Sequence, residues 1–278
     1  MAPTWSAAIA RGRQDGFPLL APSLAQLGSD FDPTGFERLA AAEPWHFWFS
    51  PRARLLANLV AKHFPNAAGF LEIGCGTGYV TGAMIARRPW SKVMGGEVAA
   101  AGLSHAARLL PPQVELMQID AREMPFRAAF DVIGCFDVLE HIAEDQQVLD
   151  GFARALRPGG GVVLAAPQHM WLWSGADVFA QHKRRYARGE LEAKCRLAGL
   201  EVVASLSYAT VTLPLLLASR FARRKVSDSE GAPEELHPPG WLNAILRTAL
   251  QAEVSLSLIG LHWPVGGSRV VVARLPRG

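Results

Sequence analysis

The stretch Phe70-Leu71-Glu72-Ile73-Gly74-Cys75-Gly76-Thr77-Gly78 decides the fold of this chain. Its apolar beginning predicts a short buried strand over residues 69–73, and residues 79–88 have the pattern of a helix that follows. The glycines between them permit a tight turn and let the backbone approach a ligand closely. Ligands of open α/β sheets bind at the carboxyl ends of strands, so the stretch predicts a ligand-binding loop.

The alternation of strands and helices continues after this loop. We expect further strands over residues 92–97, 114–119, 130–136, 161–166, 201–206 and 268–275, the fourth of them following the turn signal Arg157-Pro158-Gly159-Gly160. Helices are expected between them over residues 99–110, 144–156 and 190–198. Short apolar strands separated by helices indicate parallel pairing with helices on both faces. The predicted fold class is α/β, a Rossmann-like doubly wound sheet that is mostly parallel, with an antiparallel last strand and a helical cap.

Two flanking regions lie outside this alternation. Pro and Gly punctuate residues 1–35, which we expect to be irregular, whereas residues 36–64 look helical. After residue 206 we expect an apolar segment to Ala218, a polar Pro-rich loop over 226–240 and a helix over 241–258. The chain then divides into an N-terminal segment with a cap helix (1–64), a ligand-binding core (65–206 with 263–278), and an insertion or cap that contacts substrate or membrane (207–262).

The composition excludes several classes of protein. The chain has 278 residues, of which 50% are hydrophobic and 19% charged, so it can bury a large core and is unlike a disordered protein. Its net charge of +3 gives no reason to expect a nucleic-acid partner. Cys75, Cys135 and Cys195 have neither disulfide nor zinc spacing, and Arg11 and Arg13 interrupt any signal peptide. We therefore expect a cytoplasmic protein.

One segment raises the question of membrane contact. Residues 206–218 are apolar but shorter than the ~20 residues that a spanning helix needs, and Pro214 interrupts them. The basic residues within 220–225 are typical of a solvated helix end, or of contact with an anionic membrane surface. Peripheral contact through residues 206–225 at the inner membrane face stays open, and the oligomeric state is not predicted.

Tyr79 and Glu72 discriminate between ligands for the glycine loop. A dinucleotide fingerprint, G-x-G-x-x-G/A, requires Gly or Ala where a pattern starting at Gly74 has Tyr79. The Glu72 carboxylate would repel a pyrophosphate but suits a cationic ligand, and S-adenosylmethionine carries an ammonium and a sulfonium. A nicotinamide-dependent oxidoreductase is therefore disfavoured, and a glycine turn without any ligand is the second alternative.

Carboxylates stand at the ends of four successive predicted strands, at Glu72, Glu97, Asp120 and Asp137. Glu97 follows the glycine loop by about 20 residues, where an acidic residue can hydrogen-bond ribose hydroxyls. Asp120 can accept a hydrogen bond from an adenine amino group. Each carboxylate alone could be a helix N-cap, but the row of four favours a nucleoside ligand.

The chain resembles class I S-adenosylmethionine-dependent methyltransferases over roughly residues 40–210 and 263–275. The resemblance rests on a series of motifs: residues 71–78, Glu97, Gln118-Ile119-Asp120-Ala121, Phe130-Asp131-Val132-Ile133, Phe136-Asp137-Val138-Leu139-Glu140-His141-Ile142 and Leu156-Arg157-Pro158-Gly159-Gly160. The run from Val138 to His141 looks like the small-molecule branch that includes ubiquinone-biosynthesis O-methyltransferases. Residues 167–186 resemble a bacterial subgroup that often accompanies cell-surface polysaccharide or secondary-metabolite genes. The sequence departs from many relatives at Glu97, where they have Asp.

The resemblance implies S-adenosylmethionine as the cofactor and assigns roles to named residues. Glu72 and the loop would hold the methionine part, Glu97 the ribose, and Asp120 with Ala121 the adenine. The loop residues concerned are Gly74, Cys75, Gly76 and Gly78. Phe136 and Asp137 would line the wall near the methionine.

Trp48 and Arg52 lie one helical turn apart, hence on one face of the N-terminal helix. In relatives such a helix closes over the cofactor, and its arginine can meet the cofactor carboxylate. The alternative is a core tryptophan and a surface arginine.

His141 and His182 are the candidate catalytic bases, together with Tyr186. His141 follows the strand that ends beside the expected methyl donor, and histidine suits proton transfer near neutral pH; a structural cap is its alternative role. Glu140 and His141 could ligate a divalent metal with a third group, but we expect no metal. His182, Tyr186 and the arginines between them follow the fifth strand, and could bind the acceptor or form a solvated basic turn.

The sequence therefore predicts S-adenosylmethionine-dependent methyl transfer to a small molecule or a lipid or glycan intermediate, with oxygen as the favoured acceptor atom. A catalytically silent S-adenosylmethionine-binding scaffold protein is the main alternative.

Overall fold

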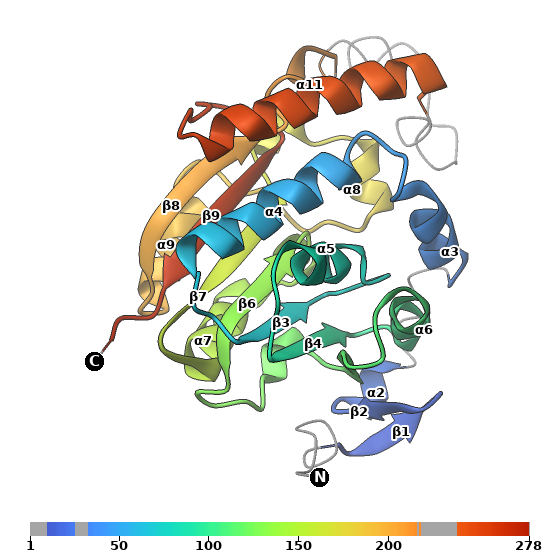
Figure 1. Ribbon diagram of the computed structural model, residues 1–278, viewed down its shortest axis with the longest axis vertical. Coiled ribbons are helices and arrows are strands. Elements are labelled where there is room, and N and C mark those ends of the chain that lie inside the picture. Colours follow the sequence, from blue (N-terminus) through green and yellow to red (C-terminus); the bar gives the residue numbers. More distant parts are fainter. Residues whose placement is uncertain (1–9, 26–32, 216, 218–237, 278) are drawn as a thin grey trace.

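A single mixed sheet organises the chain (Figure 1). The computed structural model describes residues 10–25, 33–215, 217 and 238–277. Within them, nine strands pair in the order β1-β2-β5-β4-β3-β6-β7-β9-β8. Their bounds are β1 Gly12–Gln14, β2 Phe17–Leu19, β3 Gly69–Ile73, β4 Lys92–Glu97, β5 Glu115–Gln118, β6 Phe130–Phe136, β7 Leu156–Pro167, β8 Glu201–Tyr208 and β9 Ser268–Arg274.

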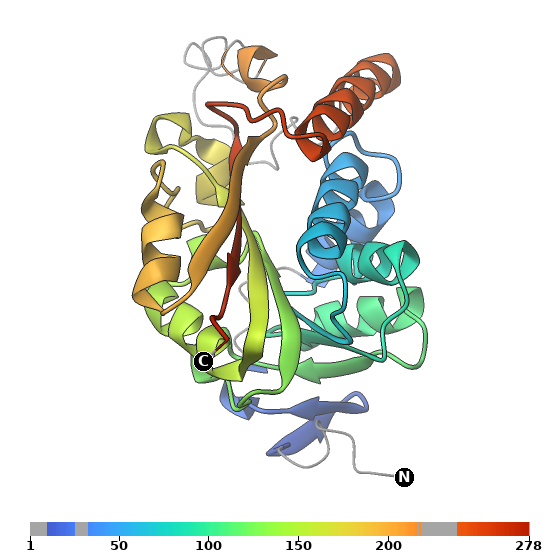
Figure 2. The same ribbon diagram turned by 60° about the vertical axis from the view of Figure 1, so that its left-hand side comes forward.

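Helices cover both faces of this sheet (Figure 2). On one side lie α7 (Asp145–Ala155) and α9 (Glu190–Leu197), and on the other α4 (Phe49–His63), α5 (Tyr79–Arg87), α6 (Ala100–Leu109) and α11 (Gly240–Leu258). The remaining helical elements are α2 (Pro22–Ala25), α3 (Pro33–Ala42), α8 (Gly175–Phe179) and the 3₁₀ turns η2 (Ala121–Glu123), η3 (Leu139–His141) and η4 (Met170–Leu172). The predicted Rossmann-like α/β fold is confirmed.

Parallel pairing fixes where the strands end. β3 pairs with β4 and β6, and β4 pairs with β5, all in parallel. Ile73 lies opposite Gly96 on one side and Cys135 on the other, so the carboxyl ends of these strands reach the same edge. β9 is antiparallel to both β7 and β8, as the sequence predicts for the last strand.

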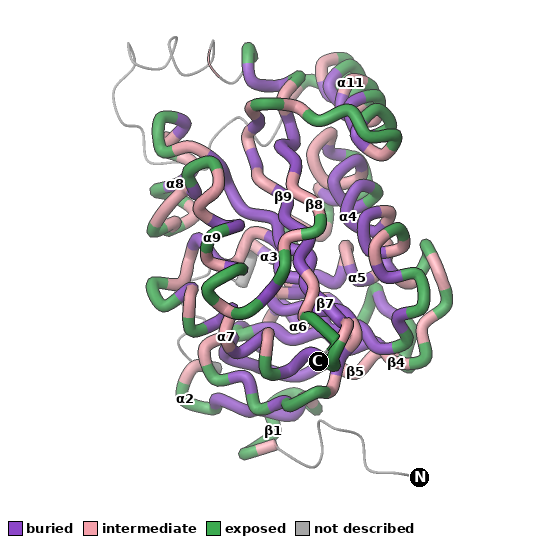
Figure 3. Tube along the Cα trace, turned by 90° about the vertical axis from the view of Figure 1, so that its left-hand side faces the viewer, coloured by how far each residue is buried: buried purple, intermediate pink, exposed green. Residues whose placement is uncertain are grey.

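The alternation of side chains along β3 divides the core into two layers. Leu71 and Ile73 pack with Val148 of α7 in one cluster, whereas Phe70 packs with Leu55 of α4 in the other. Burial of each such side chain stabilises the fold by about 1.5–3 kcal/mol. The central strands are buried almost throughout, and exposed residues gather on the outer helices and loops (Figure 3).

The expectation of an irregular N-terminus is wrong for residues 12–25. Here β1 and β2 form a hairpin, and β2 adds to the core sheet in parallel with β5 through Leu19 and Gln118. The hairpin turn is Asp15-Gly16, whose φ angles are 50° and 87°. Asp-Gly with two positive φ angles is a favoured two-residue hairpin turn, so the signal was present in the sequence.

Two further expectations need correction. The predicted helix over 36–64 is two helices, α3 and α4, with turns over 43–48 between them; Pro44 cannot donate the hydrogen bond that would continue α3. The turn signal over 157–160 lies inside β7, which begins at Leu156, because Leu156 still pairs with Phe130 before the register shifts.

The insertion contributes α11, which packs against α4 and β8. Glu253 accepts hydrogen bonds from the backbone N–H groups of Thr210 and Val211. Asn243 accepts from Phe47 N–H at 2.7 Å and donates to the Trp45 carbonyl at 2.8 Å, so α11 holds the turns between α3 and α4. The basic residues within 220–225 lie outside the described residues. No helix within the described part of the chain is long and apolar enough to cross a membrane.

Asn243→Ala should loosen the turns over 43–48 without disrupting the sheet. Loss of two partly buried hydrogen bonds should lower the free energy of unfolding by about 1–3 kcal/mol. Hydrogen exchange should show faster exchange at Phe47, whereas the exposed Thr248→Ala on the same helix should leave exchange there unchanged. Unchanged protection in the Asn243 variant would contradict this link.

Candidate functional site

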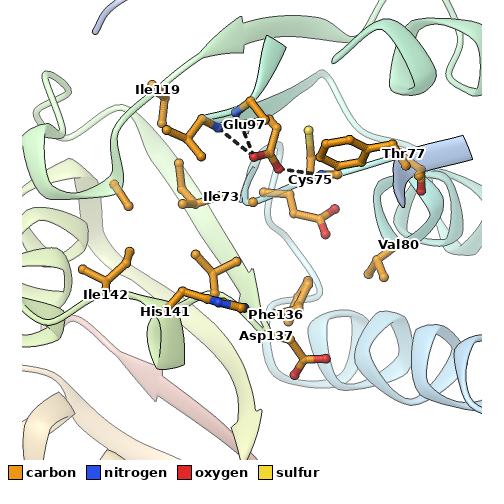
Figure 4. Close-up of a pocket in the computed structure, with 18 of the residues that line it drawn as sticks. Ile73, Cys75, Thr77, Val80, Glu97, Ile119, Phe136, Asp137, His141 and Ile142 are labelled. Atoms are coloured by element: carbon orange, nitrogen blue, oxygen red, sulfur yellow. Dashed lines mark hydrogen bonds between the residues drawn. The ribbon is translucent and has the colours of Figure 1, made fainter. Parts of the chain in front are cut away.

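A cavity of about 570 Å³ opens where β3, β4, β5 and β6 end. In Figure 4, Ile73, Glu97 and Ile119 face it from one side, and Phe136, Asp137 and His141 from the other. Most of the sequence-predicted site residues line it: Arg52, Glu72, Gly74, Cys75, Gly76, Glu97, Asp120, Ala121, Phe136, Asp137 and His141. Trp48, Gly78, His182 and Tyr186 do not.

The glycines of the loop serve different purposes. Gly76 has φ = 50°, and a Cβ there would meet nothing within 4 Å, so its surface is open for close ligand approach. Gly78 also has a positive φ, but a Cβ there would lie 2.8 Å from Leu110 Cδ1. Gly78 therefore allows α5 to pack beside the end of α6, and it does not line the cavity.

Glu72 and Glu43 are carboxyls held away from water in the cavity wall. Glu72 is buried and accepts a hydrogen bond from Thr81; burial raises its pKa to about 8. Burial likewise raises the pKa of Glu43 to about 7, although Thr77 Oγ1 donates to it at 2.6–2.7 Å. Glu43 has no recognisable sequence signal, because it follows α3 in irregular backbone.

Glu97 and Asp120 already have partners. Glu97 accepts from the backbone N–H of Gly76 at 2.9 Å, Val98 at 2.8 Å and Ala99 at 3.2 Å. Asp120 caps η2 and pairs with both Nε and Nη2 of Arg122. Capping thus accounts for part of the hydrogen bonding of Asp120, and backbone N–H groups account for part of that of Glu97. Both carboxylates also line the cavity, where each oxygen can accept a further hydrogen bond.

Arg52 and Asp137 form an ion pair between α4 and the end of β6. Arg52 Nη2 lies 2.8 Å from Asp137 Oδ2, and Asp137 has the unusual φ of 54°. The Arg52 side chain is buried, and its Nε has no hydrogen-bond partner among the described residues. Trp48, one turn earlier, instead packs on Tyr208 with ring centroids 5.4 Å apart.

The wall chemistry fits a ligand with both cationic and anionic ends. Because burial raises the pKa of Glu43 to about 7 and that of Glu72 to about 8, both carboxyls are partly protonated near neutral pH, and an ammonium group would stabilise their ionised forms. The buried Arg52 has a free donor for a carboxylate. Apolar contacts come from Ile119 and Ile142.

A smaller cavity of about 300 Å³ adjoins the first and shares Phe49 and Asp137 with it. Its wall is mainly apolar and aromatic, with Phe47 and Trp48. The groups in its wall that can carry charge are His46, Asp137, Glu140, His182 and Arg185.

His141 and His182 come together at the boundary between the cavities, with ring centroids 4.8 Å apart. His141 lines the larger cavity and His182 the smaller. Burial, together with a smaller effect of His182, lowers the pKa of His141 to about 4, so His141 is neutral at physiological pH. No local sequence pattern indicates this proximity, because 40 residues separate the two histidines.

Tyr186 and Arg184 lie away from both cavities. Tyr186 is fully buried in the core, and its hydroxyl donates to Asp145 at 2.8 Å. Burial and Asp145 raise its pKa, which leaves it unsuited to proton transfer. Arg184 pairs with the same carboxylate at 2.9 Å. The predicted catalytic role of Tyr186 is therefore not supported by its position.

A methyltransferase domain model matches residues 71–164. A ubiquinone biosynthesis O-methyltransferase from Pseudomonas aeruginosa is 31% identical over 193 residues, covering 62% of this chain and 78% of the relative. The chain belongs to the class I S-adenosylmethionine-dependent methyltransferases. Its cofactor is S-adenosylmethionine, as the sequence predicts.

Other relatives agree with this family. A trans-aconitate 2-methyltransferase from Azoarcus sp. is 31% identical over 166 residues, which cover 59% of this chain and 62% of the relative. The chain therefore spans about three-fifths of the length of that relative.

Solved structures show the same fold at lower identity. A [4+2]-cyclase has a TM-score of 0.60 at 22% identity over 95% of this chain and 100% of that chain. A Haemonchus contortus phosphoethanolamine N-methyltransferase in complex with S-adenosyl-L-methionine has a TM-score of 0.59 at 17% identity, over 91% of this chain and 60% of that chain.

Glu72→Gln should stabilise the ligand-free protein in a pH-dependent way. Because the folded-state pKa of Glu72 is raised to about 8, its favourable contribution exists below the unfolded pKa of 4.5 and is lost as pH rises through 8. The melting temperature of the variant relative to wild type should therefore increase between pH 5 and pH 9. Each kcal/mol of difference in unfolding free energy corresponds to a shift of ~2–4 °C. The exposed Glu123→Gln serves as the control, and a pH-independent difference for Glu72→Gln would refute the burial effect.

Proposed function

We propose that this protein transfers the methyl group of S-adenosylmethionine to an oxygen atom of a small-molecule acceptor or a lipid or glycan intermediate. The observation that carries the proposal is the pair of adjoining cavities that share Phe49 and Asp137. The larger one has the carboxylates and glycine loop for the donor. The smaller one offers a mainly apolar space beside it for the acceptor.

The proposed cofactor contacts follow from the cavity wall. Glu72 and Glu43 lie where the ammonium group can be held, and Arg52 can donate to the cofactor carboxylate through Nε. Glu97 accepts from the ribose hydroxyls, and Asp120 from the adenine amino group, beside Ala121. The bound cofactor supplies an electrophilic methyl group on a sulfonium.

The chain's contribution to catalysis is to orient the acceptor and exclude water. Transfer requires the acceptor atom in line with the methyl group at near-attack distance. The aromatic side chains of Phe47, Trp48 and Phe49 can fix a small acceptor in the smaller cavity. At the boundary, the neutral His141 can accept a hydrogen bond from an acceptor hydroxyl, and His182 is held in place by Asp177 at 2.9 Å.

The size and polarity of the smaller cavity, together with the named relatives, support this acceptor class. A space of about 300 Å³ admits a small molecule or one end of a larger one. Several relatives are named as ubiquinone biosynthesis O-methyltransferases, which favours oxygen. The exposed Trp241 and Ile245, one turn apart on α11, offer an apolar surface compatible with a lipid-linked acceptor and with peripheral membrane contact at the cytoplasmic face.

Isothermal titration calorimetry should show S-adenosylhomocysteine binding in the micromolar range. Asp120→Ala should weaken this binding at least tenfold, because a hydrogen bond to a charged group contributes about 1.5–3 kcal/mol. Glu123→Ala, an exposed carboxylate of the same 3₁₀ turn, should bind like wild type, with melting curves confirming that both variants fold. Absence of binding by wild type would overturn the proposal, and binding without turnover across hydroxylated and carboxylated acceptors would favour a silent scaffold protein.

A further inference from the structure

Three potential metal ligands meet in the wall between the two cavities. Glu140, His141 and His182 each offer one ligand atom, and these atoms all lie within 4.8 Å of one another. Glu140 and His141 belong to η3, directly after β6, whereas His182 comes from the segment after α8. Figure 4 shows His141 at the edge of the larger cavity.

Glu140 lacks the partners that a buried carboxylate normally has. It is fully buried, and neither of its carboxylate oxygens accepts a hydrogen bond from another of the described residues. Buried carboxylates are normally paired, hydrogen-bonded or bound to metal, because their desolvation is costly. Its Oε1 faces Nε2 of His182 at 3.9 Å, which leaves room for an ion between two groups that can both ligate it.

His182 is oriented like a metal ligand. Its Nδ1 lies 2.9 Å from Asp177 Oδ1, so Asp177 accepts the Nδ1 proton and the Nε2 lone pair is directed toward Glu140. Asp177 itself is held by Arg185 at 2.7 and 3.0 Å and by the Ser174 N–H at 2.8 Å. A carboxylate that fixes the tautomer of a ligating histidine is the usual second partner in metal sites.

We propose that Glu140, His141 and His182 bind one divalent transition-metal ion, such as Zn²⁺ or Mn²⁺, between the two cavities. Two imidazole nitrogens and one carboxylate oxygen suit such metals. Bonds of about 2.0–2.2 Å would bring the ligand atoms to roughly 3–3.5 Å from one another, a closure that side-chain rotation can supply. Three protein ligands leave an open position toward the cavities.

A chemical role for the ion follows, and it rests on the proposed methyl transfer. An acceptor hydroxyl bound at the open position would have its pKa lowered by the ion, and its proton would pass to water. The acceptor oxygen then forms a bond to the methyl carbon while the carbon–sulfur bond breaks and its electron pair stays on sulfur, giving S-adenosylhomocysteine. In this arrangement both histidines are ligands, and the ion replaces a free histidine as the activating group.

Titration of the chelator-treated protein with Zn²⁺, and separately with Co²⁺, tests the site without cofactor or acceptor. We expect one ion per chain by competition with a chromophoric chelator, and visible Co²⁺ absorption bands typical of nitrogen and oxygen ligands. His182→Ala and Glu140→Gln should each weaken Zn²⁺ binding at least 100-fold, and Asp177→Asn about 10-fold through loss of ligand orientation. His262→Ala, an exposed histidine outside the cluster, should bind like wild type.

The proposal is overturned if wild type binds no Zn²⁺, or if Zn²⁺ binding is unchanged in both ligand variants. S-adenosylhomocysteine binding by Glu140→Gln confirms that this variant is folded, so its loss of metal binding can be interpreted. Because metal binding is measured alone, failure of methyl transfer would leave this result standing, and absence of the metal site would leave cofactor binding unaffected.

Discussion

The parallel register of β3, β4, β5 and β6 is the constraint on which the rest of the structure depends. Because these strands run in the same direction and end at one edge, residues from four distant parts of the sequence surround one cavity. The helices that connect parallel strands must cross over the sheet, and they bury both of its faces. The edge where the strands end is left for loops, and there polar groups can face a ligand.

Carboxylates gather at this edge, but they are not equivalent. Glu97 and Asp120 are stabilised in the ligand-free protein by backbone N–H groups and by Arg122. Glu43 and Glu72 are held mainly by threonine hydroxyls, and burial raises the pKa of both. Burying an ionisable carboxyl lowers the stability of the folded protein, and such groups are typical of binding and catalytic sites. The first pair fixes the shape of the cavity, and the second pair favours a cationic ligand.

The fold does not determine which reaction occurs, so the residues at the boundary between the two cavities are the ones that distinguish this chain. Similar folds occur in a [4+2]-cyclase and an N-methyltransferase, so the sheet alone does not define a reaction. In this chain the boundary is formed by Asp137, Glu140, His141 and His182, with Asp177 behind it. The α11 insertion reaches the same region indirectly, since Asn243 holds the turns that precede Phe49.

The sequence by itself determined the order and type of the core elements. Strands β3, β4 and β6 have the predicted bounds, because a buried strand with glycine or carboxylate residues at its end has a local signature. Parallel pairing then followed from the alternation with helices, and with it the position of most of the residues that we propose bind the cofactor. The Asp15-Gly16 hairpin turn is an equally local signal.

Only the tertiary structure decided which polar residues meet across long separations. Tyr186 and His182 lie four residues apart, yet one is fully buried against Asp145 and the other lines a cavity. Glu43 enters the cavity because Pro44 ends α3 and Asn243 anchors the following turns. The pairing of His141 with His182 likewise depends on how the segment after β7 folds back over η3. Side-chain proximity and desolvation arise from packing between distant segments, and no local pattern encodes them.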